Sequence, residues 1–391
     1  MSGGKTNRVS GPCCGATAKG NAVAGRPYTT HQRPARGCAA GGRGKETVFV
    51  RHLETESVTS APPAEEAPPE EPEPMPEAER VELDLGPLQP AQAIEVCRCI
   101  YDAYRYTYVN EHMYYPDRVV ALNQSGDMVS AVASTPDGEV AGHAALVFPE
   151  ETREIADLAI VATKAKFRGQ SIARRLGEYL SREALARGLA GMFLEEVTVH
   201  TFTQQFCHRL GFGDCAFLLA YSPATMAFKG IAEETGARRS VIVGFKYLKP
   251  PPPAPVHAPE RHRDIIARIY ESLGAPATFA GAGEAAAAAA IPAASELHVA
   301  VNTGRSVATI HVPVYGRDLE RRLRDEMYRL RREDVKVMDV LLDLGSPGTD
   351  TVTTALEAAG FVFTGLIPGG PSGDRLVLQY FNGVVVDYDA I

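Results

Sequence analysis

The feature that most constrains the fold of this chain is a strand, a turn and a helix in direct succession. Glu154–Val161 has the composition of a buried strand, and residues 168–187 repeat apolar side chains at helical spacing. Small residues within 168–173 stand where the helix should begin. They let an anion approach backbone N–H groups closely, and the helix dipole favours negative charge there. The segment therefore predicts an α/β fold with a phosphate-binding turn.

The elements around this segment predict a mixed central sheet flanked by helices. Apolar residues recur at helical spacing over Ala91–Asn110, and Asp137-Gly138 marks a hairpin between two strands. Met192–His200 is a further strand, a short helix covers Thr203–Leu210, and two more strand-like runs follow. We assign residues 85–249 to this first domain.

A proline-rich hinge at residues 250–258 precedes a second half with a similar order of elements. Phe206–Phe212 in the first half and Ala355–Phe361 in the second are both short helices that end in Gly-Phe and lead into a strand. Because a repeated unit implies a repeated fold, we predict a tandem duplication, with the second α/β domain at residues 259–391.

The first 84 residues have the composition of a disordered tail. Residues 1–45 carry eight Lys/Arg and no Asp/Glu, whereas residues 53–84 carry eleven Asp/Glu against Arg80 alone. Pro62–Glu79 is an extended, self-repelling Pro/Glu linker. The rest of the chain is mildly acidic, within a total net charge of −8. This balance argues against a nucleic-acid partner.

The cysteines and the hydropathy pattern predict a cytoplasmic protein without a metal. Seven cysteines give an odd count and lack the spacing of a zinc site, which favours a reducing compartment. No run of 18 apolar residues and no apolar signal core occur in the sequence. We therefore expect neither a membrane span nor a secretory signal.

The turn at Arg168-Gly169-Gln170-Ser171-Ile172-Ala173 resembles the signature of the GNAT (Gcn5-related N-acetyltransferase) family, Arg/Gln-x-x-Gly-x-Gly/Ala. Arg168 matches the first position and Ala173 the last, whereas Ser171 stands where the family usually has Gly. The later Leu210-Gly211-Phe212 strengthens the resemblance. It implies a GNAT-type mixed central sheet, followed by a second, degenerate GNAT-like domain, and acetyl-CoA as co-substrate. The alternative is a tight βα turn with a capping serine.

The resemblance also implies cofactor contacts. The six turn residues 168–173 would hold the pyrophosphate of acetyl-CoA. A backbone N–H of the preceding strand, at Val161 or Ala162, would bind the thioester oxygen. The family's usual acid is a Tyr in the helix before Leu-Gly-Phe, but Cys207 stands at that position. Cys207 is thus either a proton donor or a buried structural thiol.

Two residues on one strand are candidate general bases. Strict alternation along Met192–His200 places Glu196 and His200 on one face and Glu195 on the other. Transfer to an amine needs a base that removes the ammonium proton, and Glu and His are suited to this. The alternative is that Glu196 satisfies a buried partner and His200 caps the next helix.

A cluster of tyrosines follows the first helix. Since each buried hydroxyl needs a partner, the cluster is larger than a helix core requires. It lines an acceptor groove, or it packs between the two halves. Its members are Tyr101, Tyr104, Tyr106, Tyr108, Tyr114 and Tyr115.

The leading functional prediction is an N-acetyltransferase that transfers acetyl from acetyl-CoA directly to an amine of a small molecule or protein, with general-base assistance. A non-catalytic acyl-CoA-binding regulator is the alternative, and an interaction module that has lost CoA binding is a third class. We expect acetyl-CoA and an amine as partners, no nucleic acid and no membrane. The oligomeric state is not determined by the sequence, and a homodimer is one possibility. The second half closes the acceptor site or forms an interface.

Overall fold

A computed structural model describes most of the chain beyond the N-terminal tail. The described residues are 81–149, 152–198, 201–224, 237–251, 254–275, 277–280, 291–370 and 373–386. The prediction of disorder for the tail therefore lies outside the described residues up to position 80. Residues 81–84 were also assigned to the tail, but they are ordered: Val81 donates its backbone N–H to Gln170 Oε1 at 3.0 Å, and Leu83 is buried in the core.

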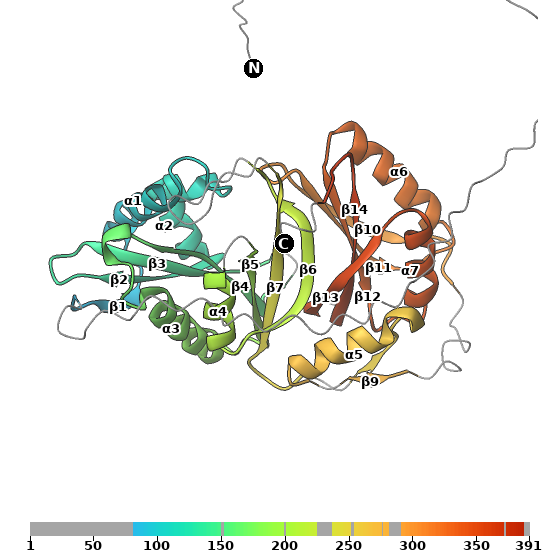
Figure 1. The fold of residues 1–391 in the computed structure, drawn as a ribbon, viewed down its shortest axis with the longest axis horizontal. Helices are drawn as coiled ribbons and strands as arrows, with labels where there is room; N and C mark the ends of the chain where they lie inside the picture. The colour runs from blue at the N-terminus through green and yellow to red at the C-terminus, as the bar shows by residue number, and fades with distance from the viewer. Residues whose placement is uncertain are drawn as a thin grey trace, which may run out of the picture. The chain divides into compact units, whose positions relative to one another are not determined.

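The first half contains most of the elements expected from the sequence, in the expected order (Figure 1). These are β1 (Asp84–Pro87), α1 (Ala93–Tyr104), α2 (Pro116–Ser125), β2 (Met128–Ser134), β3 (Val140–Val147), β4 (Ile155–Thr163), α3 (Ile172–Ala186), β5 (Gly191–Val197), α4 (Thr201–Arg209), β6 (Gly213–Ser222) and β7 (Arg239–Tyr247). The sequence analysis missed β1 and α2. It also started the third helix too early, because residues 168–171 form the turn itself.

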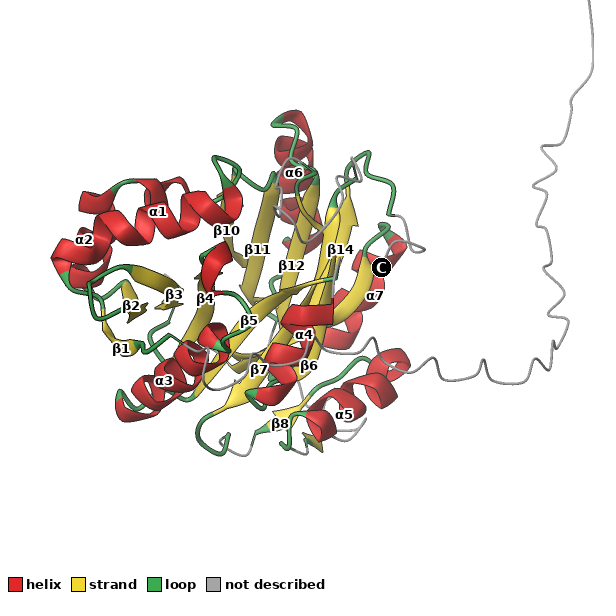
Figure 2. Cartoon of the chain, turned by 60° about the vertical axis from the view of Figure 1, so that its left-hand side comes forward, coloured by secondary structure: helices red, strands yellow, loops and turns green. Residues whose placement is uncertain are grey.

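Helices cover both faces of this half of the sheet. Figure 2 shows α1 and α2 on one side of β2–β4 and α3 on the other. Two separate apolar cores result, because alternate side chains of each strand point to opposite faces. Leu176 and Leu180 of α3 belong to one core, and Val96 and Ile100 of α1 belong to the other.

The second half repeats this mixed architecture. Its elements are β8 (Pro255–Val256), α5 (Arg263–Ser272), β9 (Thr278–Phe279), β10 (Glu296–Asn302), β11 (Val307–Val314), α6 (Leu319–Arg332), β12 (Val337–Asp343), α7 (Thr349–Ala358), β13 (Val362–Gly370) and β14 (Gly373–Phe381). The strand order β10-β11-β12-β14-β13 has the same pattern as β3-β4-β5-β7-β6 in the first half. Strands β4 and β5 run parallel, and so do β11 and β12.

The two halves share one sheet of 12 strands. The join is the antiparallel contact of β13 with β6, where Gly365 lies opposite Ala216. Part of the predicted hinge is also structured, because Pro255 and Val256 pair with β9. The α/β fold class predicted from the sequence is confirmed. No helix within the described ranges is both long and apolar enough to cross a membrane.

Candidate active site

The turn before α3 has the backbone conformation that the sequence suggested. Gly169 has φ +81° and Ser171, the residue before the helix, has φ +55°. Arg168, Gly169 and Ser171 are exposed. No side chain caps the first turn of the helix at Ser171, so its leading N–H groups are available to an anion.

The six turn residues do not all face outward. The Gln170 side chain is buried and accepts the Val81 N–H, so only its backbone can meet a ligand. Ile172 is buried in the core against α3 and β3. Arg168, Gly169, Ser171 and the half-exposed Ala173 remain as the accessible part of the turn.

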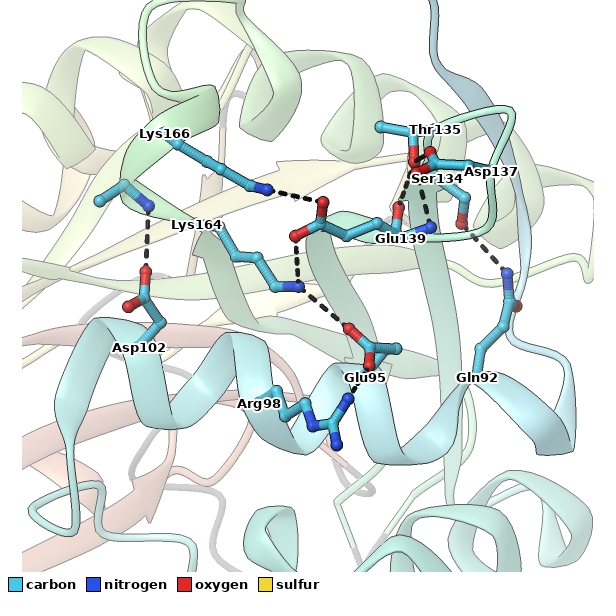
Figure 3. A network of polar contacts seen from close by, with 11 residues as sticks. Gln92, Glu95, Arg98, Asp102, Ser134, Thr135, Asp137, Glu139, Lys164 and Lys166 are labelled. Atoms are coloured by element: carbon cyan, nitrogen blue, oxygen red, sulfur yellow. Dashed lines mark hydrogen bonds and ion pairs between the residues drawn. The ribbon is translucent and has the colours of Figure 1, made fainter.

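A polar network ties the start of the turn to α1 (Figure 3). Lys164 Nζ lies 3.1 Å from Glu95 Oε2 of α1 and 3.0 Å from Glu139 Oε1 at the start of β3. Asp102 of α1 accepts the Ala165 N–H at 3.1 Å. Burial opposes the charge on Lys164, but the bonds to the two glutamates outweigh it and raise its pKa. The residues leading into the turn are therefore held by charged contacts.

Ser171 is in a backbone region that only glycine adopts without cost. Ser171→Gly should stabilise the protein by about 0.5–1 kcal/mol, because the left-handed conformation disfavours a Cβ. Chemical denaturation measures this change. Ser181→Gly is the matched control: it makes the same change within α3, where glycine costs about 1 kcal/mol. Loss of stability in Ser171→Gly would contradict this interpretation of the turn.

A β-bulge interrupts β4 just before the turn. His143 pairs with Ala162 and Ala145 with Ala159, so Ala144 lies opposite two residues. Ile160 has φ +57°, which is rare for a β-branched residue. The bulge reverses the alternation of side chains along the strand. Before it, Ala156 and Leu158 face α3, and after it, Ile160 and Ala162 face α1.

A buried histidine supports this bulge. His143 Nδ1–H donates to the carbonyl oxygen of Ile160 at 2.9 Å, and Ser130 Oγ–H donates to Nε2 at 3.0 Å. Asn123 Nδ2 in turn donates to Ser130 Oγ at 3.2 Å. Burial lowers the pKa of His143 to about 4, so the ring is neutral at pH 7. The sequence analysis did not identify this residue.

Strands β4 and β5 separate next to the bulge. Within the described residues they pair only at Ile155, Ala156 and Asp157, whereas β5 continues to pair with β7 as far as Val197. Val161 and Ala162 lie beyond the last β4–β5 pair. The backbone of β4 is therefore not covered by β5 at the two positions expected to supply the thioester N–H.

An acidic cluster lies where the strands separate, on the face opposite α3. Asp157 of β4 and Glu195 of β5 are both partly exposed, and Arg305 Nη1 lies 2.6 Å from Glu195 Oε2. The buried Asp157 Oδ1 has no hydrogen-bond partner among the described residues. Burial and the nearby Glu195 raise the pKa of Asp157 well above its ordinary value, although Arg305 opposes the shift. A carboxylate with a raised pKa is a stronger base than an ordinary aspartate.

Glu196, one of the two predicted bases, lies elsewhere. Glu196 is fully buried on the other face of β5. Its carboxylate, a ring nitrogen of His208 and the Asp214 carboxylate provide ligand-type atoms within 4.8 Å of one another. Burial raises the pKa of Glu196 to about 7, and the negative charge of Asp214 adds to this effect. His208 and Asp214 are exposed and bond each other at 3.0 Å, so the trio does not by itself indicate a metal site. His200 lies outside the described residues.

Cys207 of α4 is brought together with Glu196. The thiol is buried, and burial together with the Glu196 carboxylate raises its pKa above the usual value. A thiol with a raised pKa is a weak proton donor. Its environment therefore favours the packing alternative for Cys207.

The tyrosine cluster divides between surface and interior. Tyr104 and Tyr108 pack in a tilted arrangement with ring centroids 4.7 Å apart, and burial raises the pKa of both hydroxyls. Asp157 and Glu195 further raise the pKa of Tyr108, which places this ring beside the acidic cluster. Tyr106 and Tyr115 are exposed. Tyr104 and Tyr108 are thus the members positioned to line an acceptor surface.

Sequence reasoning missed Asp157, Glu195 and Arg305 as a group. Alternation along the strand did place Glu195 opposite Glu196, but no local pattern indicated which face holds the site. Arg305 is 110 positions from Glu195 in the chain, and no spacing signal links them. An acidic residue within the apolar strand β4 was the one available signal for Asp157.

With this geometry established, residues 96–212 match the family model described as the acetyltransferase (GNAT) family. The matched region includes the bulged strand β4, the turn and α3. The chain therefore contains a GNAT acetyltransferase domain, as the resemblance implied, and members of this family use acetyl-CoA as the acetyl donor.

Solved structures with similar folds include several acetyltransferases. The ribosomal-protein-S18-alanine N-acetyltransferase from Escherichia coli is 19% identical with a TM-score of 0.34, covering 42% of this chain and 92% of its own. An N-acetyltransferase from Staphylococcus aureus is 14% identical with a TM-score of 0.35, and the match covers 43% of this chain and 99% of that protein. A Salmonella typhimurium protein solved with its cofactor acetyl-CoA is 16% identical with a TM-score of 0.36, covering 43% and 95%. Among proteins of curated function, none matches this chain significantly in sequence.

Proposed function

We propose that this protein transfers the acetyl group of acetyl-CoA to a primary amine, using the separation of β4 and β5 as its active site. The observation that carries the proposal is the succession of a bulged β4, a left-handed turn and an uncapped helix N-terminus within the GNAT domain. Each of these features presents backbone N–H groups, which is what binding of an acyl-CoA requires.

The chain's own residues fit acetyl-CoA at two places. The N–H groups of the 168–173 turn are suited to the pyrophosphate, and the exposed Arg174 adds positive charge beside it. The N–H of Val161 or Ala162 is suited to the thioester oxygen, because both residues lie beyond the last β4–β5 pair. His143 holds the bulge carbonyl, so it fixes the direction of these N–H groups.

Asp157 is our candidate for the general base. Its pKa is raised, and its Oδ1 lacks a partner within the described structure. Acetyl-CoA supplies an activated acyl group: the amine nitrogen forms a bond to the carbonyl carbon, and the carbon–sulfur bond breaks. Asp157 accepts, through water, the proton that the ammonium loses, and the departing thiolate takes a proton from solvent.

The second half, residues 259–391, is proposed to be a degenerate GNAT-like domain. The repeated strand order and the two parallel pairs support a tandem duplication. The counterpart of the cofactor turn is the segment Tyr315-Gly316-Arg317-Asp318 between β11 and α6, which has only one small residue. We therefore assign acetyl-CoA binding to the first half alone.

We further propose a cytoplasmic location. Four cysteines in the described ranges are free and buried, which suits a reducing compartment. A nucleic-acid partner is not expected from the acidic balance of the chain. A homodimer is compatible with this function but is not required by it.

Binding of acetyl-CoA tests the proposal directly. Acetyl-CoA at 100 times its Kd should stabilise the wild-type protein by about 2.7 kcal/mol, because it binds only the folded state. Gly169→Glu should abolish this stabilisation by placing a carboxylate against the pyrophosphate. Thermal shift measures binding, and release of free CoA thiol with added amines measures transfer.

Gly138→Glu is the matched control for this experiment. Gly138 also has a positive φ, +89°, but it lies in the β2–β3 hairpin, with no atom near an added Cβ. This variant should keep the full acetyl-CoA shift. Wild-type protein without any shift at millimolar acetyl-CoA would overturn the proposed function, and a shift without thiol release would leave only binding.

A further inference from the structure

We propose that Glu195 and Arg305 are the acceptor-recognition residues of this site, and that they select a small primary amine that has no carboxylate. The inference rests on the proposed acetyl transfer and adds the chemical class of the acceptor. It also gives the second half a part in the active site, because Arg305 belongs to the turn between β10 and β11.

The position of Glu195 supports this role. It lies two residues beyond Phe193, the last residue of β5 that pairs with β4. Side chains two apart on a strand share a face, so Glu195 lies on the same face as Phe193 and Asp157. Asp157, Phe193 and Glu195 on this face are partly exposed, whereas the neighbouring residues of β4 and β5 that face α3 are buried. An acceptor can therefore reach Glu195 from the side opposite the cofactor turn.

The charges of the cluster determine which acceptor fits. Arg305 pairs with Glu195 at 2.6 Å, and no cation of the described structure pairs with Asp157. With Asp157 deprotonated, as its role as a base requires, the trio has a net charge of −1, which a single ammonium group neutralises. The carboxylate of an amino-acid acceptor bound here would meet like charges, while the Arg305 guanidinium is already paired with Glu195.

Aromatic rings complete a surface suited to a cation. Arg305 lies 4.6 Å from the centroid of the Tyr221 ring, and the tilted pair Tyr104 and Tyr108 lies beside the carboxylates. The negative faces of tyrosine rings attract cations, so these rings add to the attraction for an ammonium group.

The backbone around Arg305 is held mainly by residues of the first half. Arg238, at the start of β7, donates Nη2–H to the Arg305 carbonyl oxygen at 2.7 Å and Nε–H to the Ala220 carbonyl oxygen at 2.6 Å. Asn302 Oδ1 accepts the Arg305 N–H at 3.0 Å. Gly304 lies against the Val109 carbonyl, where an added Cβ would approach to 3.4 Å. The guanidinium is therefore presented by a fixed turn, as a specificity group requires.

Amine and amino-acid pairs that differ only in the carboxylate test the inference. Suitable pairs are tyramine with tyrosine, agmatine with arginine, and cadaverine with lysine. The full-length protein should use each amine with a kcat/KM about 10²-fold above that of its amino acid, since like charges in a site of this kind are strongly disfavoured. CoA thiol release measures both members of each pair.

Glu195→Gln should change this preference. It frees the Arg305 guanidinium to bind a carboxylate, so the kcat/KM ratio should shift about 10-fold or more toward the amino acid. Glu320→Gln is the matched control, because it breaks the exposed Arg324–Glu320 pair on α6, which is not part of the acidic cluster. Its ratio should equal that of the wild type.

A second variant keeps the test decisive if Glu195→Gln folds poorly. Arg305→Met leaves two carboxylates without a positive partner. The ratio of kcat/KM for cadaverine, which has two ammonium groups, to that for tyramine should therefore rise about 10-fold relative to the wild type. Equal use of amines and amino acids, or unchanged ratios in both variants, would overturn the inference. Acetyl-CoA thermal shifts measured on the same samples separate this result from failure of the proposed function itself.

Discussion

Asp157→Asn should lower turnover by about 10²–10⁴-fold while acetyl-CoA binding persists, because it removes the proposed general base and preserves the shape of the side chain. The raised pKa of Asp157 also determines how kcat/KM should depend on pH. The wild-type kcat/KM should fall as the pH is lowered through this raised pKa, since the protonated carboxyl cannot accept a proton. Steady-state thiol release over a pH series measures both effects.

Glu196→Gln is the informative comparison, because Glu196 was the base suggested by the sequence. Its carboxylate faces α4 and β6 rather than β4, so the variant should keep its rate within about threefold, a change worth less than 1 kcal/mol. A large loss in Glu196→Gln with an active Asp157→Asn would reverse the assignment and restore the sequence-based hypothesis.

Glu196→Gln should also alter the pH dependence of the protein's stability. The folded pKa of Glu196, about 7, lies above the ordinary value of 4.5. Glu196 therefore contributes stability below pH 4.5, and that contribution is lost as the pH rises toward 7. Compared with the wild type, Glu196→Gln should become relatively more stable as the pH is raised across this range.

Gly365→Ala should destabilise the protein by about 2–5 kcal/mol, through backbone strain and overpacking together. Gly365 has φ +129°, and an added Cβ would lie 2.4 Å from the Ala216 Cα and from the Cys215 carbonyl oxygen. These backbone atoms belong to β6 at its one pairing with β13, so they cannot move without breaking the join between the halves. Calorimetry should show a lower Tm, and thiol release should fall as Arg305 loses its position.

Gly373→Ala separates the steric contribution from the conformational one. Gly373 has a similar φ of +117°, but no atom lies near an added Cβ. This control should therefore lose only about 1–2 kcal/mol, the cost of the unfavourable backbone conformation. Equal stability losses in the two variants would contradict the close contact at Gly365 as the source of the effect.

The sequence alone specified most of the local structure. Alternation and helical spacing located most strands and helices of the first half within a few residues. The small residues at 168–173 identified the turn, because its geometry depends on residues adjacent in the chain. The α/β fold class followed from the order of these elements. The short strand β1 and the helix α2 were missed, since neither has a strong apolar period.

Tertiary structure decided which face of the sheet carries the proposed site. Glu195 and Glu196 are neighbours in sequence and equally acidic, yet one meets Arg305 and the other is enclosed beside Cys207. The bulge at Ile160 also reverses the side-chain alternation that sequence reasoning assumes to be regular. Arg305 reaches Glu195 because β13 joins β6 and makes one sheet of the two halves. Local periodicity reports how each element forms, but the grouping of charges depends on contacts between distant residues, which no local pattern encodes.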